Sequence, residues 1–326
     1  MAKNTVSVLV ITYNQKGFIA QWVESLRAQT TPPDEVVIVD DSSTDGTYEQ
    51  LQAISKKHGY TLMRTPRNSG PSAARNIGLQ SVHGDFICFL DGDDYFLPEK
   101  ITVQKKALEK NPNAVLCYGD CLIDKQGTIL PFNLSALMPL NEGALFDQLL
   151  SRNSMLLGGV MLRSRLAGNH RFDETLMRAE DYMYFLEISK KNDTFALVKE
   201  PVFVYRRANA GLSSQRLETI ACNEEVLRRV AGWALPKPQV QLLNDQKTII
   251  LAEKVDLLLR SGGAGSLAAL RELESLSPSR SRQWLLRLLH YNSFIGRMAY
   301  VLFEFYRSLR HPRKNQDELM MEQFTR

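Results

Sequence analysis

The chain has 326 residues, of which 44% are hydrophobic and 23% are charged. This composition is ordinary for a globular protein and argues against a largely disordered chain. Lys and Arg number 40 against 36 Asp and Glu, and the net charge of +4 is too small to indicate a nucleic-acid-binding protein. No signal peptide is expected, and no apolar stretch approaches the roughly 18 residues of a spanning helix.

Short β-rich runs alternate with helical patterns in the first part of the chain. The run at 6–11 is almost entirely β-branched and apolar, which is typical of a strand buried on both faces. Alternation of this kind predicts an α/β fold with a mostly parallel sheet flanked by helices. The expected strands are residues 6–11, 35–39, 60–64 and 85–90, and the expected helices are 18–26, 47–57 and 71–80.

The alternation loosens after about residue 114. We expect Pro201 to interrupt a strand there, because proline cannot donate to a sheet ladder. From about Leu217 the pattern is helical throughout. The expected strands of this part are 114–118, 122–123, 128–130 and 197–205.

The cysteines are expected to be plain thiols. Cys117 and Cys121 have a spacing seen in zinc sites, but no second Cys/His pair accompanies them. This usage favours a reducing, cytoplasmic location.

Three carboxylates crowd into Asp91-Gly92-Asp93-Asp94, directly after an expected buried strand. Such a cluster is costly unless a cation neutralises it, and Mg²⁺ or Mn²⁺ uses one or two carboxylates together with phosphate oxygens. A solvated turn with a helix cap from Asp94 is the alternative interpretation.

Other polar segments follow the first two strands and open two helices. Asp41 could accept hydrogen bonds from a base or a ribose, or simply belong to a capping loop. Arg75, near a helix start, would suit a diphosphate, or it could be a surface arginine after a tight turn. Glu180 and Asp181 precede an apolar helical run, where an acid is favoured electrostatically but could also act as a general base.

Taken together, these pieces resemble glycosyltransferase family 2, whose members have the GT-A nucleotide-sugar fold. The resemblance covers residues 5 to about 210 and rests on five segments in the right order. They are VSVLVITYN (6–14), VIVDDSSTDG (37–46), NSGPSAARNIG (68–78), GDFICFLDGDDYFLP (84–98) and FDETLMRAED (172–181).

The resemblance implies a role for each matching position. Asp181 matches the catalytic base, with Glu180 beside it. Asp93, together with Asp91, matches the ligands of Mn²⁺ or Mg²⁺. The implied nucleotide-sugar-binding residues are Thr12, Tyr13, Asn14, Asp41, Arg75, Asp91 and Gly92, and Arg206 and Arg207 lie in a loop that could contact the diphosphate.

The implied activity is that of an inverting hexosyl- or N-acetylhexosaminyltransferase (EC 2.4 class). It would move a sugar from a nucleotide-diphosphate donor, by default a UDP-sugar, to a glycan or lipid-linked acceptor in O-antigen, capsule or exopolysaccharide synthesis. Two alternatives are a sugar nucleotidyltransferase and a non-catalytic binding protein with the same fold. A sugar nucleotidyltransferase would need a glycine- and arginine-rich loop after the first strand, and this chain has none there. The presence of both Asp93 and Asp181 argues against a non-catalytic binding protein.

We expect a catalytic domain at 1–215 and a C-terminal helical region at 216–326. Within the first, 5–115 would bind the nucleotide-sugar and 116–215 would form the acceptor part. Basic and aromatic residues are interleaved from about 282 to 314. This segment could pack on the catalytic domain, form an oligomer, or lie peripherally on the cytoplasmic face of a membrane.

Overall fold

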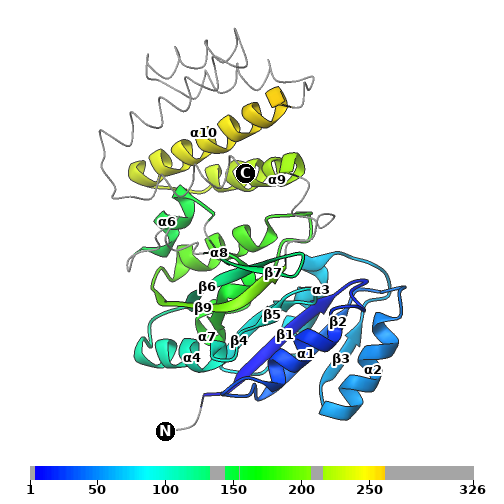
Figure 1. Ribbon diagram of the computed structural model, residues 1–326. Coiled ribbons are helices and arrows are strands. Elements are labelled where there is room, and N and C mark those ends of the chain that lie inside the picture. Colours follow the sequence, from blue (N-terminus) through cyan, green and yellow to red (C-terminus); the bar gives the residue numbers. More distant parts are fainter. Residues whose placement is uncertain (1–3, 133–143, 154, 207–215, 261–326) are drawn as a thin grey trace. The chain divides into compact units, whose positions relative to one another are not determined.

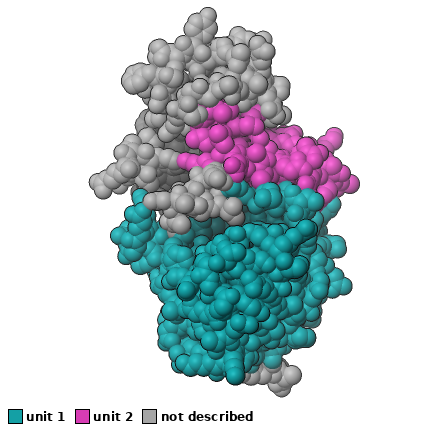
Figure 2. Space-filling view, turned by 90° about the vertical axis from the view of Figure 1, so that its right-hand side faces the viewer, with its two compact units in different colours: residues 1–214 teal, residues 215–326 magenta. Residues whose placement is uncertain are grey.

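The computed structural model describes residues 4–132, 144–153, 155–206 and 216–260. The chain divides into two compact units, residues 1–214 and 215–326 (Figure 2). The strands of the first unit are β1 (Val6–Thr12), β2 (Glu35–Asp40), β3 (Thr61–Arg64), β4 (Phe86–Asp91), β5 (Tyr95–Phe96), β6 (Leu116–Lys125), β7 (Thr128–Phe132), β8 (Val160–Arg163) and β9 (Phe195–Arg206). Its helices are α1 (Ile19–Arg27), α2 (Thr47–His58), α3 (Pro71–Leu79), α4 (Lys100–Lys110), α6 (Leu145–Ser151), the 3₁₀ helix η1 (Leu157–Gly159), α7 (Ser164–Ala167) and α8 (Glu180–Lys191).

The strands form one sheet in the order β3-β2-β1-β4-β8-β6-β9-β5, with β7 paired to β6 (Figure 1). The first four run parallel. All seven residues of β1 are buried, as predicted for a central strand covered on both faces. The α/β fold and the expected elements of this half are confirmed to within a residue or two.

Parallel pairing recurs in the other half between β6 and β9, whereas β8, which lies between β4 and β6, pairs antiparallel with both. The two strands predicted around residue 120 form the single strand β6. It turns into β7 through Gln126 (φ 54°) and Gly127 (φ 87°), the pair of positive φ angles that tight hairpins prefer.

Pro201 was expected to interrupt its strand, and this expectation is wrong. It lies within β9 opposite Asp120, and the register of β6 and β9 shifts on either side of Asp120. Such an irregularity accommodates a residue that has no N–H to donate.

Alternate residues of β1 face different helices. Val6, Val8 and Val10 belong to the same buried cluster as Trp22 of α1 and residues of α4. Leu9 points to the other face, where α3 approaches so closely that a Cβ on Gly78 would overlap the Leu9 side chain. This close approach positions α3 over β1.

The described part of the second unit is helical, as predicted from about Leu217 onward. It consists of α9 (Arg216–Ala231) and α10 (Lys237–Arg260), which pack together and share the ion pair Lys254–Glu224 at 2.6 Å. The basic segment predicted from about residue 282 lies outside the described residues. Within the described ranges, no helix combines the length and apolarity needed to cross a membrane.

Candidate active site at the carboxyl ends of β1, β2 and β4

Three parallel strands end side by side and bring the polar segments together. In the sheet register Thr12 lies opposite Asp40, and Ile11 lies opposite Asp91. The ends of β1, β2 and β4 therefore meet at one edge, where open α/β sheets bind ligands.

Arg75 links this edge to the segment that carries Glu180 and Asp181. Its Nη1 donates to Glu180 Oε1 at 2.6 Å, and its Nη2 donates to Asp91 Oδ1 at 2.8 Å. The Arg75 side chain is only 5% exposed, and its guanidinium lies 5.3 Å from the ring centre of Phe172. Burial alone would lower the pKa of Arg75, but the two carboxylates raise it, so the guanidinium stays charged.

Asp181 lies in the first turn of α8, beside Glu180. Burial, followed by the negative charge of Glu180, raises the pKa of Asp181 to about 7. Its carboxylate accepts a hydrogen bond from the Tyr182 N–H at 2.7 Å. A carboxylate with such a pKa can take a proton from a hydroxyl group near neutral pH.

The residues after Asp91 form a tight acidic turn packed against β1. A Cβ on Gly92 would lie 2.9 Å from both Cβ and Oγ1 of Thr12, so only glycine fits there. Burial and the neighbouring Asp91 raise the pKa of the half-buried Asp93 to about 6. Burial also raises the pKa of Asp94 well above its usual value, and Asp93 and Asp91 add to that effect.

Arg206, at the end of β9, forms hydrogen bonds with the residues of this acidic turn. Its N–H donates to Asp94 Oδ1 at 2.7 Å, and its guanidinium bonds the Asp93 carbonyl, Gln21 and Asp124. The guanidinium also lies 4.4 Å from the ring centre of Phe18. Sequence reasoning did not predict that Gln21 and Asp124 contact Arg206, because they lie 80 or more positions away from it in the chain. Arg207 lies outside the described residues.

The predicted base-binding residues gather at the ends of β1 and β2. Asp41 is buried and accepts hydrogen bonds from Thr65 Oγ1 at 2.7 Å and from the N–H of Gly70 at 2.8 Å. It therefore holds the turn that opens α3. Thr12 is also buried, and its Oγ1 has no hydrogen-bond partner within the described part of the chain, whereas Tyr13 is 43% exposed.

Asn14 connects the two strand ends. Its N–H donates to Ser43 Oγ at 2.9 Å, and its Oδ1 accepts from the Thr44 N–H at 2.8 Å. Its φ of 53° is left-handed, a conformation that asparagine tolerates better than most residues.

The protein supplies few ligands for a metal at this edge. Among the residues that the structure describes, no three His, Cys, Asp or Glu side chains are grouped to hold a cation. One oxygen of Asp91 is bound to Arg75 and one of Asp94 to the Arg206 N–H, while burial and the nearby Asp91 disfavour an uncompensated negative charge on Asp93 and so raise its pKa. This suits a cation that takes one or two carboxylates and completes its shell with phosphate and water oxygens.

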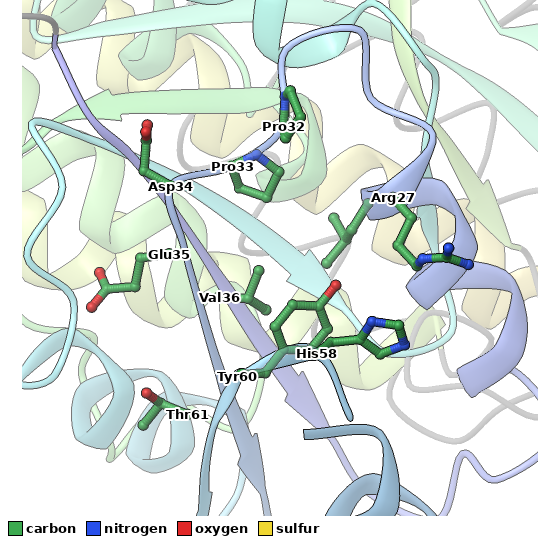
Figure 3. Close-up of a pocket in the computed structure, with 11 residues that line it drawn as sticks. Arg27, Pro32, Pro33, Asp34, Glu35, Val36, His58, Tyr60 and Thr61 are labelled. Carbon is green, nitrogen blue, oxygen red and sulfur yellow. The ribbon is translucent and has the colours of Figure 1, made fainter. Parts of the chain in front are cut away.

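A separate cavity of about 300 Å³ lies at the opposite edge of the sheet (Figure 3). Its lining includes Glu35 and Val36 at the start of β2, and Thr61 at the start of β3. Because it lies at the amino ends of these strands, it is not part of the acidic site.

The fold and this acidic edge define a GT-A architecture. TarS of S. aureus superimposes with a TM-score of 0.67 at 20% identity, covering 95% of this chain and 92% of the TarS chain. Further TarS structures contain UDP and UDP-GlcNAc. The mannosyltransferase PcManGT from Pyrobaculum calidifontis, in complex with GDP-Man and Mn²⁺, has a TM-score of 0.58 at 18% identity over 92% of this chain and 87% of that chain.

Sequence comparison identifies the family. Residues 7–130 match the glycosyl transferase family 2 profile. The putative teichuronic acid biosynthesis glycosyltransferase TuaG of Bacillus subtilis is 30% identical over 215 residues, 66% of this chain and 83% of TuaG. An uncharacterized glycosyltransferase of Rickettsia conorii is 32% identical over 196 residues, 60% of this chain, and the chain spans only 32% of that protein. The chain belongs to glycosyltransferase family 2.

Proposed function

We propose that this protein is an inverting glycosyltransferase that uses a nucleotide-diphosphate sugar. The observation that carries the proposal is the link through Arg75, which joins Asp91 at the end of β4 to Glu180, next to the half-buried Asp181. A carboxylate suited to proton transfer thereby lies beside the acidic turn suited to a metal–diphosphate.

Asp181 is the proposed general base. It accepts the proton of an acceptor hydroxyl while that oxygen attacks the anomeric carbon, so a single displacement inverts the carbon. Glu180, neutralised by Arg75, shapes the site next to the base. Thr12, Tyr13, Asn14, Asp41, Arg75, Asp91 and Gly92 form the proposed nucleotide-sugar site.

Asp93, assisted by the second oxygen of Asp91, is the proposed holder of Mn²⁺ or Mg²⁺. When bound, such a cation offsets negative charge on the leaving diphosphate. Arg206 holds the backbone of the same turn, because its guanidinium bonds the Asp93 carbonyl. A direct diphosphate contact from Arg206 is therefore not part of the proposal.

The donor is proposed to be a UDP-sugar, and the transferred group a hexosyl or N-acetylhexosaminyl unit. The TarS structures with UDP and UDP-GlcNAc support this choice, and the PcManGT structure with GDP-Man makes a GDP-sugar the competing donor. The name of TuaG supports an acceptor in cell-surface polysaccharide synthesis. The proposed location is the cytoplasm, with the C-terminal region as the candidate for peripheral contact with the cytoplasmic face of a membrane or for oligomer formation.

A donor screen tests the proposal. Purified protein is incubated with UDP-, GDP- and dTDP-sugars, with Mn²⁺ or Mg²⁺, and release of the nucleoside diphosphate is measured against an EDTA control. We expect metal-dependent release from at least one UDP-sugar. Binding without turnover of any donor would instead favour the non-catalytic alternative.

A separate experiment tests the proposed contact with the membrane. Deletion of the chain from residue 282 onward should release a membrane-associated fraction of the protein into solution, and unchanged fractionation would contradict the membrane assignment.

A further inference from the structure

The residue after Arg75 also reaches toward the segment that carries Asp181. Asn76 is buried in α3, and its side chain makes three hydrogen bonds across more than 90 positions of the chain. Its Oδ1 accepts from the Phe172 N–H at 2.8 Å. Its Nδ2 donates to the Phe172 carbonyl at 2.9 Å and to Glu174 Oε1 at 2.8 Å.

The segment held in this way has no regular secondary structure between Phe172 and Ala179. Ala179, which immediately precedes α8, has a φ of 57°, a left-handed conformation that is strained for alanine. Neither a helix nor a ladder of strand hydrogen bonds therefore fixes the approach to Asp181, and the hydrogen bonds of Asn76 hold the start of this segment against α3.

A stack of rings continues the connection into α8. The ring of Phe172 lies against that of Tyr184 with 4.2 Å between centroids and 10° between planes. Both rings also meet Phe89 of β4 edge-on, at 5.8 Å and 6.4 Å. Tyr184 lies one helical turn after Asp181, so the backbone position of Phe172 is linked to the turn that carries the carboxylate.

We propose that Asn76 is a positioning residue for the reaction, acting through Phe172 and α8 to set the location of Asp181. This inference rests on the proposed role of Asp181 as general base. Asn76 itself does not touch substrate. Two adjacent residues of α3 then hold the two ends of this segment. Asn76 bonds Phe172 at its start, and Arg75 bonds Glu180 at its end.

The test is a comparison of Asn76→Ala with a matched buried amide elsewhere. Gln29 is buried, and its side chain also makes three hydrogen bonds to backbone groups, at Ser25, Leu97 and Ile101. Gln29→Ala is expected to lower the melting temperature by a similar amount without a comparable loss of turnover. For Asn76→Ala we expect kcat to fall about 100-fold, the cost of a displacement of about 1 Å, while the Kd for UDP with Mn²⁺ stays unchanged.

A second set of variants covers the case in which Asn76→Ala does not fold. Asn76→Asp has nearly the same shape but loses both donor bonds and places a second carboxylate beside Glu174. Adding Glu174→Gln restores a donor between the two side chains, so the double variant should recover part of the lost kcat. Glu174→Gln alone keeps the acceptor for Asn76 and should be near wild type.

Asp181→Asn, assayed with the donor selected in the screen, separates the two proposals. If Asp181→Asn is fully active, the assignment of the base fails. If it is inactive while the Asn76 variants keep wild-type kcat, or lose kcat no more than Gln29→Ala, the positioning role fails. A rise in the Kd for UDP without a fall in kcat would also overturn it, because Asn76 would then act on the donor.

Discussion

Arg75 Nη1 lies 2.6 Å from Glu180 Oε1, and the two residues are 105 positions apart in the chain. The same guanidinium holds Asp91, so one buried cation joins the end of β4 to the start of α8. Two acidic clusters that would otherwise repel each other are thereby kept close together.

Arg75→Lys should lose activity and stability together, because an ammonium group cannot reproduce the two-pronged geometry of the guanidinium. Arg75→Met, which leaves Glu180 buried without its partner, should cost about 3–5 kcal/mol of unfolding free energy. Denaturant unfolding and the donor-hydrolysis rate measure both effects. In the Arg75→Met/Glu180→Gln double variant, stability but not activity should partly return. A double variant as unstable as Arg75→Met would contradict this account.

Asp181→Asn should lower kcat by about 10²–10⁴-fold, the usual contribution of a general base. Binding of UDP with Mn²⁺, measured by calorimetry, should be largely retained. The substitution should also stabilise the protein by about 1 kcal/mol at pH 8. The folded-state pKa of about 7 lies above the unfolded value, so the buried carboxylate favours folding less and less as the pH rises from about 4 to 7. Equal stability of the two proteins at pH 8 would argue against a raised pKa of Asp181 in the folded state.

The pH dependence of kcat/KM should show an acidic limb. Because Asp181 must be ionised to accept a proton and its pKa is about 7, kcat/KM should fall about tenfold per pH unit well below pH 7. Residual hydrolysis by Asp181→Asn should lack this limb. The limb should also persist with a donor that binds more tightly, since it belongs to the protein and not to the donor. A rate that is flat down to pH 5 would be incompatible with this base.

Asp93→Asn should weaken donor binding in the presence of Mn²⁺ and have little effect on binding in EDTA. Because the pKa of Asp93 is about 6, the Mn²⁺-dependent gain in wild-type affinity should diminish below pH 6, where the carboxylate becomes protonated. Calorimetric titration with UDP, with and without Mn²⁺, measures both. Asp45→Asn, which changes a carboxylate bonded to the backbone of Thr47 at 2.9 Å, is the control. An equal loss in the two variants would contradict the metal assignment.

Gly92→Ala should disrupt the acidic turn, because the added methyl group would lie 2.9 Å from Thr12. Overpacking of this kind costs about 1–3 kcal/mol, and the turn cannot shift without moving Asp91 and Asp93. Gly17→Ala is the matched control, since a Cβ at Gly17 meets nothing within 4 Å. Melting temperature and Mn²⁺-dependent UDP binding distinguish the two variants. Gly92→Ala with normal binding would show that the turn tolerates the methyl group.

The strands of the first half could be predicted closely because burial on both faces leaves a continuous apolar run in the sequence. The run at 6–11 and the observed β1 differ by one residue, Thr12. In the second half the prediction divided β6 in two and interrupted β9 at Pro201. The register shift that accommodates Pro201 depends on the partner strand, and a single strand's sequence does not contain that information.

By itself the sequence determined which residue types stand at the strand ends, and hence the family and the candidate carboxylates, because strand ends and helix starts are marked locally by burial and turn chemistry. Only the tertiary structure decided how those groups are paired. Arg75, expected near the nucleotide, is bonded to Glu180 and Asp91, and Arg206, expected to contact the diphosphate, is bonded to the acidic turn. Ion pairs and hydrogen bonds across a hundred positions depend on how α3, α8 and β9 pack on the sheet, and that packing is a property of the whole chain.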